Sequence, residues 1–303
     1  MSSDSPKGNI LMYENRDRKI SRAELVNKIS GLIDNIPPMP ESIMQLNLEA
    51  NDPNTNFHKL TQILERDPGL SAILLKLANS ALYCAGHKVA TIDEAIRNLG
   101  LGNLVTFITA SFSEKIIRNY FSSVKHLHDF FEHSQQVAMG SMLIQKHIGA
   151  NRQIQSSYWL SGLLHDIGRL ILLLASGDVG CQLISTAGEQ FSEIIHQEAN
   201  IFGLNHCAIG MKICKKWKFP AEIQTAIFRH HNPIANGIVC REGCFTMLAH
   251  IVSMGENCPD EMLESCLPEP VFKELGLNKD MLIEAKHEYI ESWEATNNLS
   301  ATG

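Results

Sequence analysis

Apolar residues recur at helical spacing along most of the chain. After Ser21 and Glu24, which fit an S-x-x-E capping box, Leu25, Ile29 and Ile33 fall on one helical face. Further helices are predicted at about 40–50, 57–64, 92–99 and 103–121. Hardly any two-residue alternation occurs in the first 150 residues. The pattern therefore predicts an all-α protein.

One segment is apolar on nearly every side. Residues 70–83, LSAILLKLANSALY, follow an Asp-Pro-Gly turn and contain only Lys76 and Asn79 as strongly polar interruptions. A helix that is apolar all round is typical of a protein core, so this one is predicted to be central and well buried. Asn79 and Ser80 are interpreted either as part of a seam between two lobes or as a cap or turn at the helix end, and the cap or turn is favoured.

The stretch from Tyr158 to Leu172, YWLSGLLHDIGRLIL, combines an apolar helix-like run with an adjacent His165 and Asp166. Buried polar groups cost a few kcal/mol unless they have partners. A divalent metal would satisfy both residues, because imidazole nitrogen and carboxylate oxygen are good ligands. Hydrogen bonds to the backbone or between the two side chains are the alternative.

Other histidines also fall on apolar faces. His133 continues the stripe of Val137, Gly140 and Ile144, and Asn205 is a plausible N-cap for a helix that begins with His206. The whole set of inward polar residues comprises His133, His165, Asp166, His206, His230 and His231. A lone histidine of this kind is usually a satisfied core residue. Six such groups on four helices favour a shared cation, because helical bundles build metal sites from facing helices.

Bulk composition places limits on the function. The 303 residues carry a net charge of −7 and are 44% hydrophobic, and the sequence pI is near 6.0. No direct nucleic-acid binding is expected from such a surface. The eight cysteines show no regular pairing pattern, and no uncharged apolar run reaches about 18 residues. The chain is expected to be cytoplasmic and without a membrane segment.

Several motifs together resemble a known family. They are IPPMPESI at 36–43, ILERDPGLSAILLKLANSALY at 63–83, IDEAIRNLG at 92–100, GLLHDIGRL at 162–170, ANIFGLNHCAIG at 199–210 and WKFPAEIQTAIFRHH at 217–231. In this order they are similar to the HDOD domain, a branch of the HD superfamily of metal-dependent phosphohydrolases. The resemblance covers roughly residues 25 to 235.

The resemblance implies an HD-like multi-helix bundle with an N-terminal helical lobe. The domains expected are an arm at 1–20, the lobe at 21–124, the bundle with the His/Asp cluster at 125–235 and a helical extension at 236–303. His133, His165, Asp166, His206, His230 and His231 match the metal ligands of the superfamily's two-metal branch, which implies one or two ions of iron, manganese or zinc. The closing Asp would fall near Ser253, and its replacement by serine puts a complete catalytic site in doubt.

Two functions follow from this resemblance. The first is a regulatory module of signal transduction that retains the metal centre and binds protein partners. The second is a metal-dependent phosphohydrolase of a phosphoester or nucleotide, in which Asp166 and Arg169 are the catalytic candidates and Arg169 neutralises substrate phosphate. A plain surface role is the alternative for Arg169. HHNPIANG at 230–237 lacks the HHExxDGxGYP pattern of cyclic di-GMP phosphodiesterases, which argues against that activity.

Overall fold

A computed structural model shows an all-α protein, as the periodicity predicts. It describes residues 14–15, 18–19, 21–50, 52, 54, 57–79, 88–149, 152–177, 193–260, 263 and 269–300. The helices are α1 (Arg22–Asn35), α2 (Glu41–Ala50), α3 (Phe57–Arg66), α4 (Pro68–Ala78), α5 (Ile92–Leu99), α6 (Leu101–Tyr120), α7 (Leu127–His147), α8 (Arg152–Leu164), α9 (Ile167–Ser176), α11 (Glu193–Phe202), α12 (His206–Lys216), α13 (Ala221–Arg229), α14 (Arg241–Ser253), η1 (Gly255–Asn257), α16 (Glu269–Leu275) and α17 (Lys279–Ser300). Two-residue strands pair antiparallel, β1 (Glu14–Asn15) with β2 (Arg18–Lys19) and β3 (Ile234–Ala235) with β4 (Ile238–Val239).

Several predicted helix starts are confirmed by their caps. Ser21 and Glu24 form the reciprocal capping box of α1. The Thr91 side chain accepts the backbone N–H of Glu94 at the start of α5, but the Glu94 carboxylate accepts from Ala90 rather than from Thr91. Asn205 caps α12 through the backbone N–H of Ala208. Local sequence is sufficient for these signals, because every partner lies within four residues.

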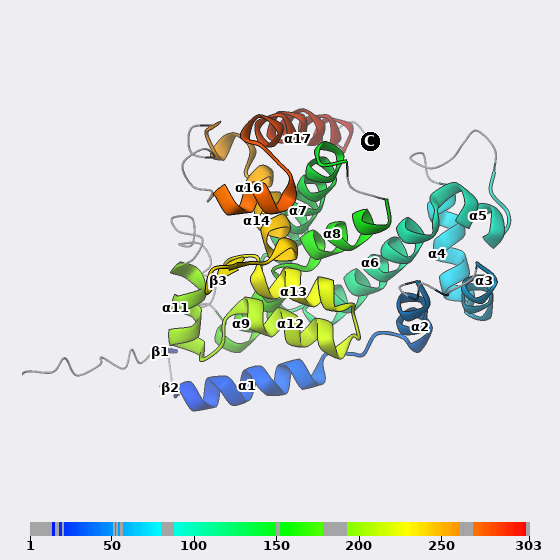
Figure 1. Ribbon diagram of the computed structural model, residues 1–303. Helices are drawn as coiled ribbons and strands as arrows, with labels where there is room; N and C mark the ends of the chain where they lie inside the picture. Colours follow the sequence, from blue (N-terminus) through cyan, green and yellow to red (C-terminus); the bar gives the residue numbers. More distant parts are fainter. Residues whose placement is uncertain are drawn as a thin grey trace, which may run out of the picture.

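The central bundle is built around α7, α8 and α14, with α9, α12 and α13 packed beside them (Figure 1). A continuous apolar core joins α8, α9, α12 and α13 to the N-terminal helices. A second apolar cluster lies between α7, α14, α16 and α17. The histidines predicted from the sequence lie between these two clusters, where several helices meet.

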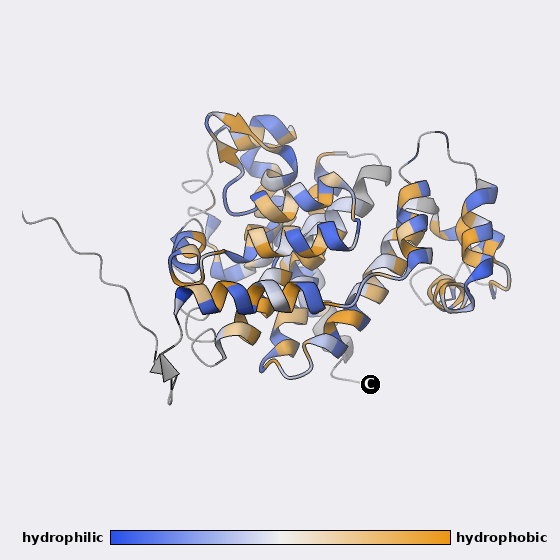
Figure 2. Cartoon of the chain, turned by 90° about the horizontal axis from the view of Figure 1, so that it is seen from below, coloured by the Kyte–Doolittle hydropathy of each residue, from blue (hydrophilic) through white to orange (hydrophobic). Residues whose placement is uncertain are grey.

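The helices α2 to α5 form a group that stands to one side of the bundle, and α6 joins the two parts (Figures 1 and 2). Helix α1 packs mainly on the bundle. It crosses the bundle against α9, α11 and α12, where the Lys28 ammonium donates to the Ala175 carbonyl and the Arg22 guanidinium to the Ala199 carbonyl. The predicted domain boundaries stay predictions. Most of the 1–20 arm lies outside the described residues, as do residues 178–192.

Helix α4 is not the central helix that its composition predicts. Only Leu70, Leu74 and Ala78 are buried, and the helix packs on α3 and α5 of the outer group and on α6. The apolar composition did not show which neighbours were available to cover it. Asn79 is the C-cap of α4, and its amide bonds to Leu75 and Val89, so the capping interpretation is confirmed for Asn79. Ser80 lies outside the described residues.

The run from Tyr158 to Leu172 is not one helix. Helix α8 ends at Leu164, α9 begins at Ile167, and His165 with Asp166 forms the turn between them. The window Ser157–Ser176 has the length and hydropathy of a membrane span, but 67% of it is buried inside the protein. A core helix passes the same test, so the window is weak grounds for a span.

The C-terminal helices cover one side of the bundle. Helix α17 packs on α7, and α16 packs on α14. The buried Lys286 ammonium donates to the Cys258 carbonyl and pairs with Asp260.

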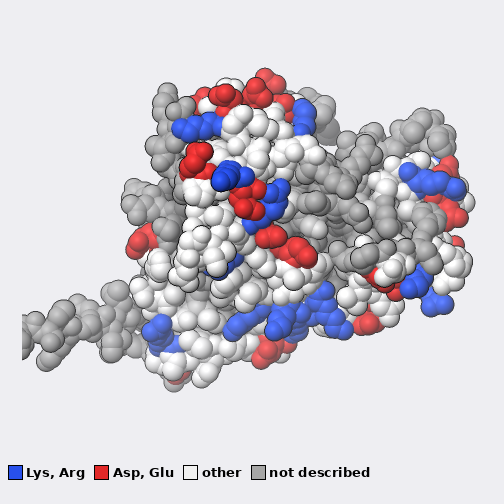
Figure 3. All heavy atoms as spheres, viewed as in Figure 1, with Lys and Arg blue, Asp and Glu red and all other residues white. Residues whose placement is uncertain are grey.

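Figure 3 shows acidic side chains gathered over the top of the molecule and basic ones along its lower part, with both signs interspersed between them.

Candidate metal centre

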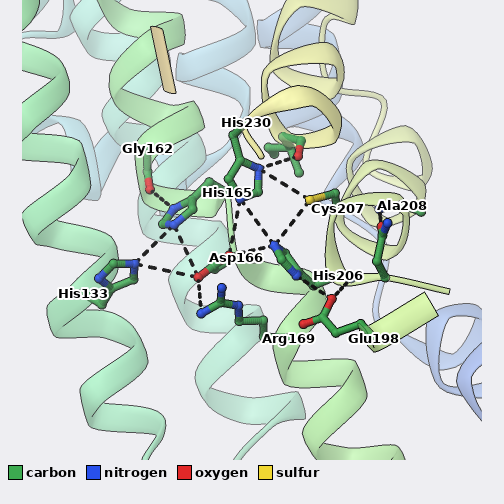
Figure 4. Close-up of polar contacts among 12 residues, drawn as sticks. His133, Gly162, His165, Asp166, Arg169, Glu198, His206, Cys207, Ala208 and His230 are labelled. Atoms are coloured by element: carbon green, nitrogen blue, oxygen red, sulfur yellow. Dashed lines mark hydrogen bonds and ion pairs between the residues drawn. The ribbon is translucent and has the colours of Figure 1, made fainter. Parts of the chain in front are cut away.

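The structure brings all six predicted residues together in one place, and Figure 4 shows five of them, all except His231. His133 comes from α7, His165 and Asp166 from the α8–α9 turn, His206 from the first position of α12, and His230 with His231 from the end of α13. His165, Asp166, His206, His230 and His231 are buried, and the side chain of His133 is 31% exposed. Their role as metal ligands stays a prediction.

Hydrogen bonds at Nδ1 orient three of the imidazole rings. His165 Nδ1 lies 2.8 Å from the Gly162 carbonyl oxygen and His230 Nδ1 lies 2.7 Å from that of Ile227. His206 Nδ1 lies 2.6 Å from Glu198 Oε2. Each acceptor requires the proton on Nδ1, and a neutral ring then has a lone pair on Nε2. Metal-ligating histidines are typically held in this way.

The Nε2 atoms of these rings converge on the Asp166 carboxylate. Its Oδ1 lies 3.2 Å from His206 Nε2 and 3.6 Å from His230 Nε2. Its Oδ2 lies 3.4 Å from His165 Nε2 and 3.8 Å from His133 Nε2. The His206–His230 and His133–His165 Nε2 pairs are 3.4 Å and 3.3 Å apart. Thus one carboxylate lies between two pairs of imidazole nitrogens.

These groups fit a divalent metal. Lone pairs on nitrogen and oxygen at such separations repel one another unless a proton or a cation lies between them. Ligand atoms around an ion with bonds of about 2.0–2.2 Å are themselves about 3.0–3.6 Å apart. Asp166 Oδ1 is buried and accepts no hydrogen bond. An ion between Asp166, His206 and His230, and a second between Asp166, His133 and His165, would satisfy the set.

Burial and neighbouring charges shift the pKa values of Asp166, His206 and His133. Burial alone would raise the pKa of Asp166, but Arg169, His165 and His206 hold it well below its ordinary value. Burial would lower the pKa of His206, but Cys207 and Glu198 raise it. Burial, together with His165, lowers the pKa of His133 to about 3. The ionised Asp166 carboxylate and the neutral His133 ring are in the protonation states that metal binding requires, whereas His206 would release a proton when a metal binds.

Arg169 is part of the centre rather than a surface residue. Its guanidinium lies 3.0 Å from Asp166 Oδ2, and its side chain is 15% exposed. It therefore compensates the buried carboxylate directly. The Arg169 Nε is buried without a hydrogen-bond acceptor in the structure.

Sequence reasoning missed three residues of the centre. His250, on α14, lies with its ring 4.7 Å from that of His133 and 5.1 Å from that of His165, centroid to centroid. Ser253, where a closing Asp was expected, instead donates to the His250 carbonyl. His250 lies one helical turn before Ser253, and this spacing was the available signal. Glu198 and Cys207 carried no such signal, because nothing in their local pattern marks them.

A glycine allows the helices that carry the centre to approach closely. A Cβ at Gly168, on α9, would lie 2.0 Å from the His206 carbonyl oxygen and 2.8 Å from the Gly210 nitrogen. Both atoms belong to the backbone of α12, so they can move aside only if the helix itself shifts. Gly168, directly after the His165–Asp166 turn and Ile167, therefore sets the distance between Asp166 and His206.

A cavity of about 460 Å³ opens at one edge of the centre. His133 and Gln136 of α7 line one side, and Tyr289 and Trp293 of α17 line the other. The α14–η1 segment completes it with Ser253, Met254, Gly255, Glu256 and Asn257, and Ile290 and Glu294 come from α17. A ligand in this cavity would reach the centre through His133.

The model of the HDOD domain matches residues 36–233, well over half of the chain. The chain belongs to the HDOD domain family. An uncharacterized protein of Treponema pallidum (strain Nichols) is 22% identical over 232 residues, which cover 77% of this chain and 44% of that protein. The chain thus spans less than half the length of this curated relative.

Solved structures of other proteins share the fold. A protein from Marinobacter aquaeolei VT8, named as a putative signal transduction protein, superposes with a TM-score of 0.68 at 18% identity over 92% of this chain and 66% of the other. A protein from Shewanella amazonensis SB2B, named as a putative phosphohydrolase, superposes with a TM-score of 0.63 at 23% identity over 86% and 93% of the two chains. At these identities the likeness shows the fold alone.

Proposed function

We propose that this protein is a regulatory module of signal transduction that retains a metal centre of the HD type. The observation that carries the proposal is the convergence on Asp166 of imidazole Nε2 atoms whose Nδ1 atoms are already engaged. A chain that had lost its metal would have no need to keep these lone pairs facing one another. Iron, manganese or zinc would be held by Asp166 with His206 and His230, and by Asp166 with His133 and His165, next to His231 and His250.

Helix α12 supports the regulatory part of the proposal. Its first residue, His206, belongs to the metal centre. At its other end, Trp217 Nε1 donates to the Pro37 carbonyl at 2.9 Å and the Lys216 ammonium donates to the Ile33 carbonyl at 3.1 Å. These carbonyls lie where α1 ends and the chain turns towards the outer helices. A shift of His206 on metal binding would therefore move α12 and, through it, the segment that follows α1. Protein partners would bind differently to the two positions of that segment.

Metal analysis tests the centre. The protein would be purified without a His-tag and without added metal, and its iron, manganese and zinc contents measured. We expect stoichiometric metal in the wild type and its loss in His165→Ala. His196→Ala, an exposed histidine on α11, serves as the matched control and should keep the metal. A metal-free wild type with unaltered stability in His165→Ala would contradict the proposal.

Hydrogen exchange tests the regulatory part. Removal of the metal should speed amide exchange in residues 33–40 as well as around the histidines, because α12 contacts both. If metal removal changes amide exchange only around the histidines, the metal centre does not affect residues 33–40, and the regulatory part of the proposal is wrong.

The second candidate function is a metal-dependent phosphohydrolase, and the cavity at His133 is the observation that favours it. A bound metal would lower the pKa of a water ligand to about 7 and polarise a phosphoryl oxygen. Asp166 would bind the metal, and Arg169, which contacts Asp166 through one guanidinium nitrogen, would neutralise phosphate. A panel of phosphoesters, nucleotides and cyclic dinucleotides, assayed with metal-loaded protein, tests this function. Turnover that is lost in Asp166→Asn would support it, and its absence across the panel would leave the regulatory function.

A further inference from the structure

Cys207 places a sulfur atom inside the group of metal-ligating side chains. Its Sγ lies 3.3 Å from His206 Nε2 and 3.8 Å from His230 Nδ1 (Figure 4). The thiol is free of any disulfide, and the residue is 2% exposed. His206, Cys207, His230 and His231 are all buried, and each offers a ligand atom within 4.8 Å of the others.

The centre thus has two chemically different ends. At one end lie the nitrogens of His133, His165 and His250, of which His133 faces the cavity. At the other end lie the nitrogens of His206, His230 and His231 together with the Cys207 sulfur. His206 Nε2 has Asp166 Oδ1 at 3.2 Å and the sulfur at 3.3 Å, so it faces both a carboxylate and a thiol.

We propose that Cys207 is a metal ligand and that it makes the His206 end select a zinc-class ion. Thiolate ligands favour zinc, and cobalt as its spectroscopic substitute, over magnesium or manganese, for which oxygen ligands are better suited. On binding, the S–H bond breaks, the sulfur–metal bond forms and the proton passes to solvent. The inference rests on the proposed function, because it requires the metal centre to exist.

The plain alternative is that Cys207 is a small core side chain. It packs with Ile194 and Ile195, and a thiol is among the most often buried side chains. Cys214 on the same helix shows what that alternative looks like. It is fully buried in the main core, and burial raises the pKa of its thiol. Unlike Cys207, Cys214 belongs to none of the groups among the described residues that could hold a metal.

Cobalt spectroscopy of the full chain distinguishes these alternatives. Resident metal would be removed with a chelator, and Co²⁺ binding would be followed by equilibrium dialysis and by absorption. We expect a strong sulfur-to-cobalt charge-transfer band in the near ultraviolet for the wild type and for Cys214→Ser. Cys207→Ser should lose the band, and its affinity for Zn²⁺ should fall at least about tenfold, while Mn²⁺ affinity changes little.

The outcomes separate the inference from the function on which it rests. Cobalt that binds to the wild type without the band would overturn the role of Cys207 and leave the metal centre standing. A band that persists in Cys207→Ser would overturn it as well. A wild type that binds no cobalt and contained no metal on purification would overturn both. Because the wild-type spectrum alone gives the first answer, failure of Cys207→Ser to fold would not prevent the test.

Discussion

Glu198 Oε2 lies 2.6 Å from His206 Nδ1 and 2.8 Å from the His206 backbone nitrogen. One buried carboxylate thus holds the first residue of α12 by its side chain and its backbone together. The side-chain contact determines which ring nitrogen carries the proton, and the backbone contact satisfies an N–H at the helix start, which has no partner within the helix. The two contacts together fix the direction of the His206 lone pair.

Glu198→Gln should therefore weaken metal binding while preserving the fold. A neutral amide is a poorer acceptor for Nδ1–H, and a loss of about 10- to 100-fold in metal affinity is typical when such a partner is removed. Competition with a chromophoric zinc chelator measures the affinity. Glu193→Gln, at the exposed start of α11, the helix that also carries Glu198, should have no effect on metal affinity. Equal affinities in the two variants would show that Glu198 does not orient His206 for a metal.

Gly168→Ala should destabilise the protein, because its Cβ would lie 2.0 Å from the His206 carbonyl oxygen. Overpacking of this kind costs about 1–3 kcal/mol in the free energy of unfolding, and it would also separate α9 from α12 and lower the metal content. The same substitution at Gly31, on α1, meets nothing within 4 Å and should stabilise by about 0.5–1 kcal/mol. Urea unfolding of both variants measures the two effects. A neutral result at Gly168 would contradict the close approach of the helices.

Asp67 should contribute stability that depends on pH. The Ser42 hydroxyl donates to Asp67 Oδ2 at 2.6 Å, and the Gly69 and Leu70 N–H groups donate to Oδ1. The Ser42 bond and these N–H groups lower the pKa of Asp67 below its ordinary value, against a smaller opposing effect of burial. Because the folded pKa lies below the unfolded one, this stability is complete above the ordinary value of about 3.9 and is lost as the pH falls through the lower folded pKa.

Asp67→Asn keeps a capping oxygen and removes the charge. Its deficit in unfolding free energy relative to the wild type should be largest near neutral pH and should shrink at about pH 3. Urea unfolding of both proteins at the two pH values measures the difference, in which the effects of all other titrating groups cancel. A deficit that does not change with pH would show that the charge on Asp67 is not involved.

Lys216→Met should loosen the connection after α1. The Lys216 ammonium donates to the Ile33 carbonyl at 3.1 Å and also to the Asp34 carbonyl, which lie in the last turn of that helix. Its loss should cost about 1 kcal/mol, because the group is partly exposed, and should speed hydrogen exchange in residues 33–40. Lys215→Met, at an exposed neighbouring position, is the control and should leave both quantities unchanged.

Most residues of the centre are ones that the sequence predicts to point inward. Helical periodicity placed His133 and His206 on inward stripes, and the family pattern added their order along the chain. The structure indeed brings all six residues together. His250 was missed because a carboxylate was sought at Ser253, whereas the ring one turn earlier lies against His133. Glu198 and Cys207 were missed because their relation to His206 exists only in three dimensions.

Local sequence patterns are sufficient to predict the helical class, the caps at Ser21 and Asn205, and the identity of most groups in the centre. These features depend on contacts within a few residues or on spacing along one helix. Packing between distant segments places α4 in the outer group and α1 on the bundle, and it breaks the run around His165 into two helices. It also places Asp166 between two pairs of imidazoles, because the distance between α9 and α12 depends on side chains far apart in the chain.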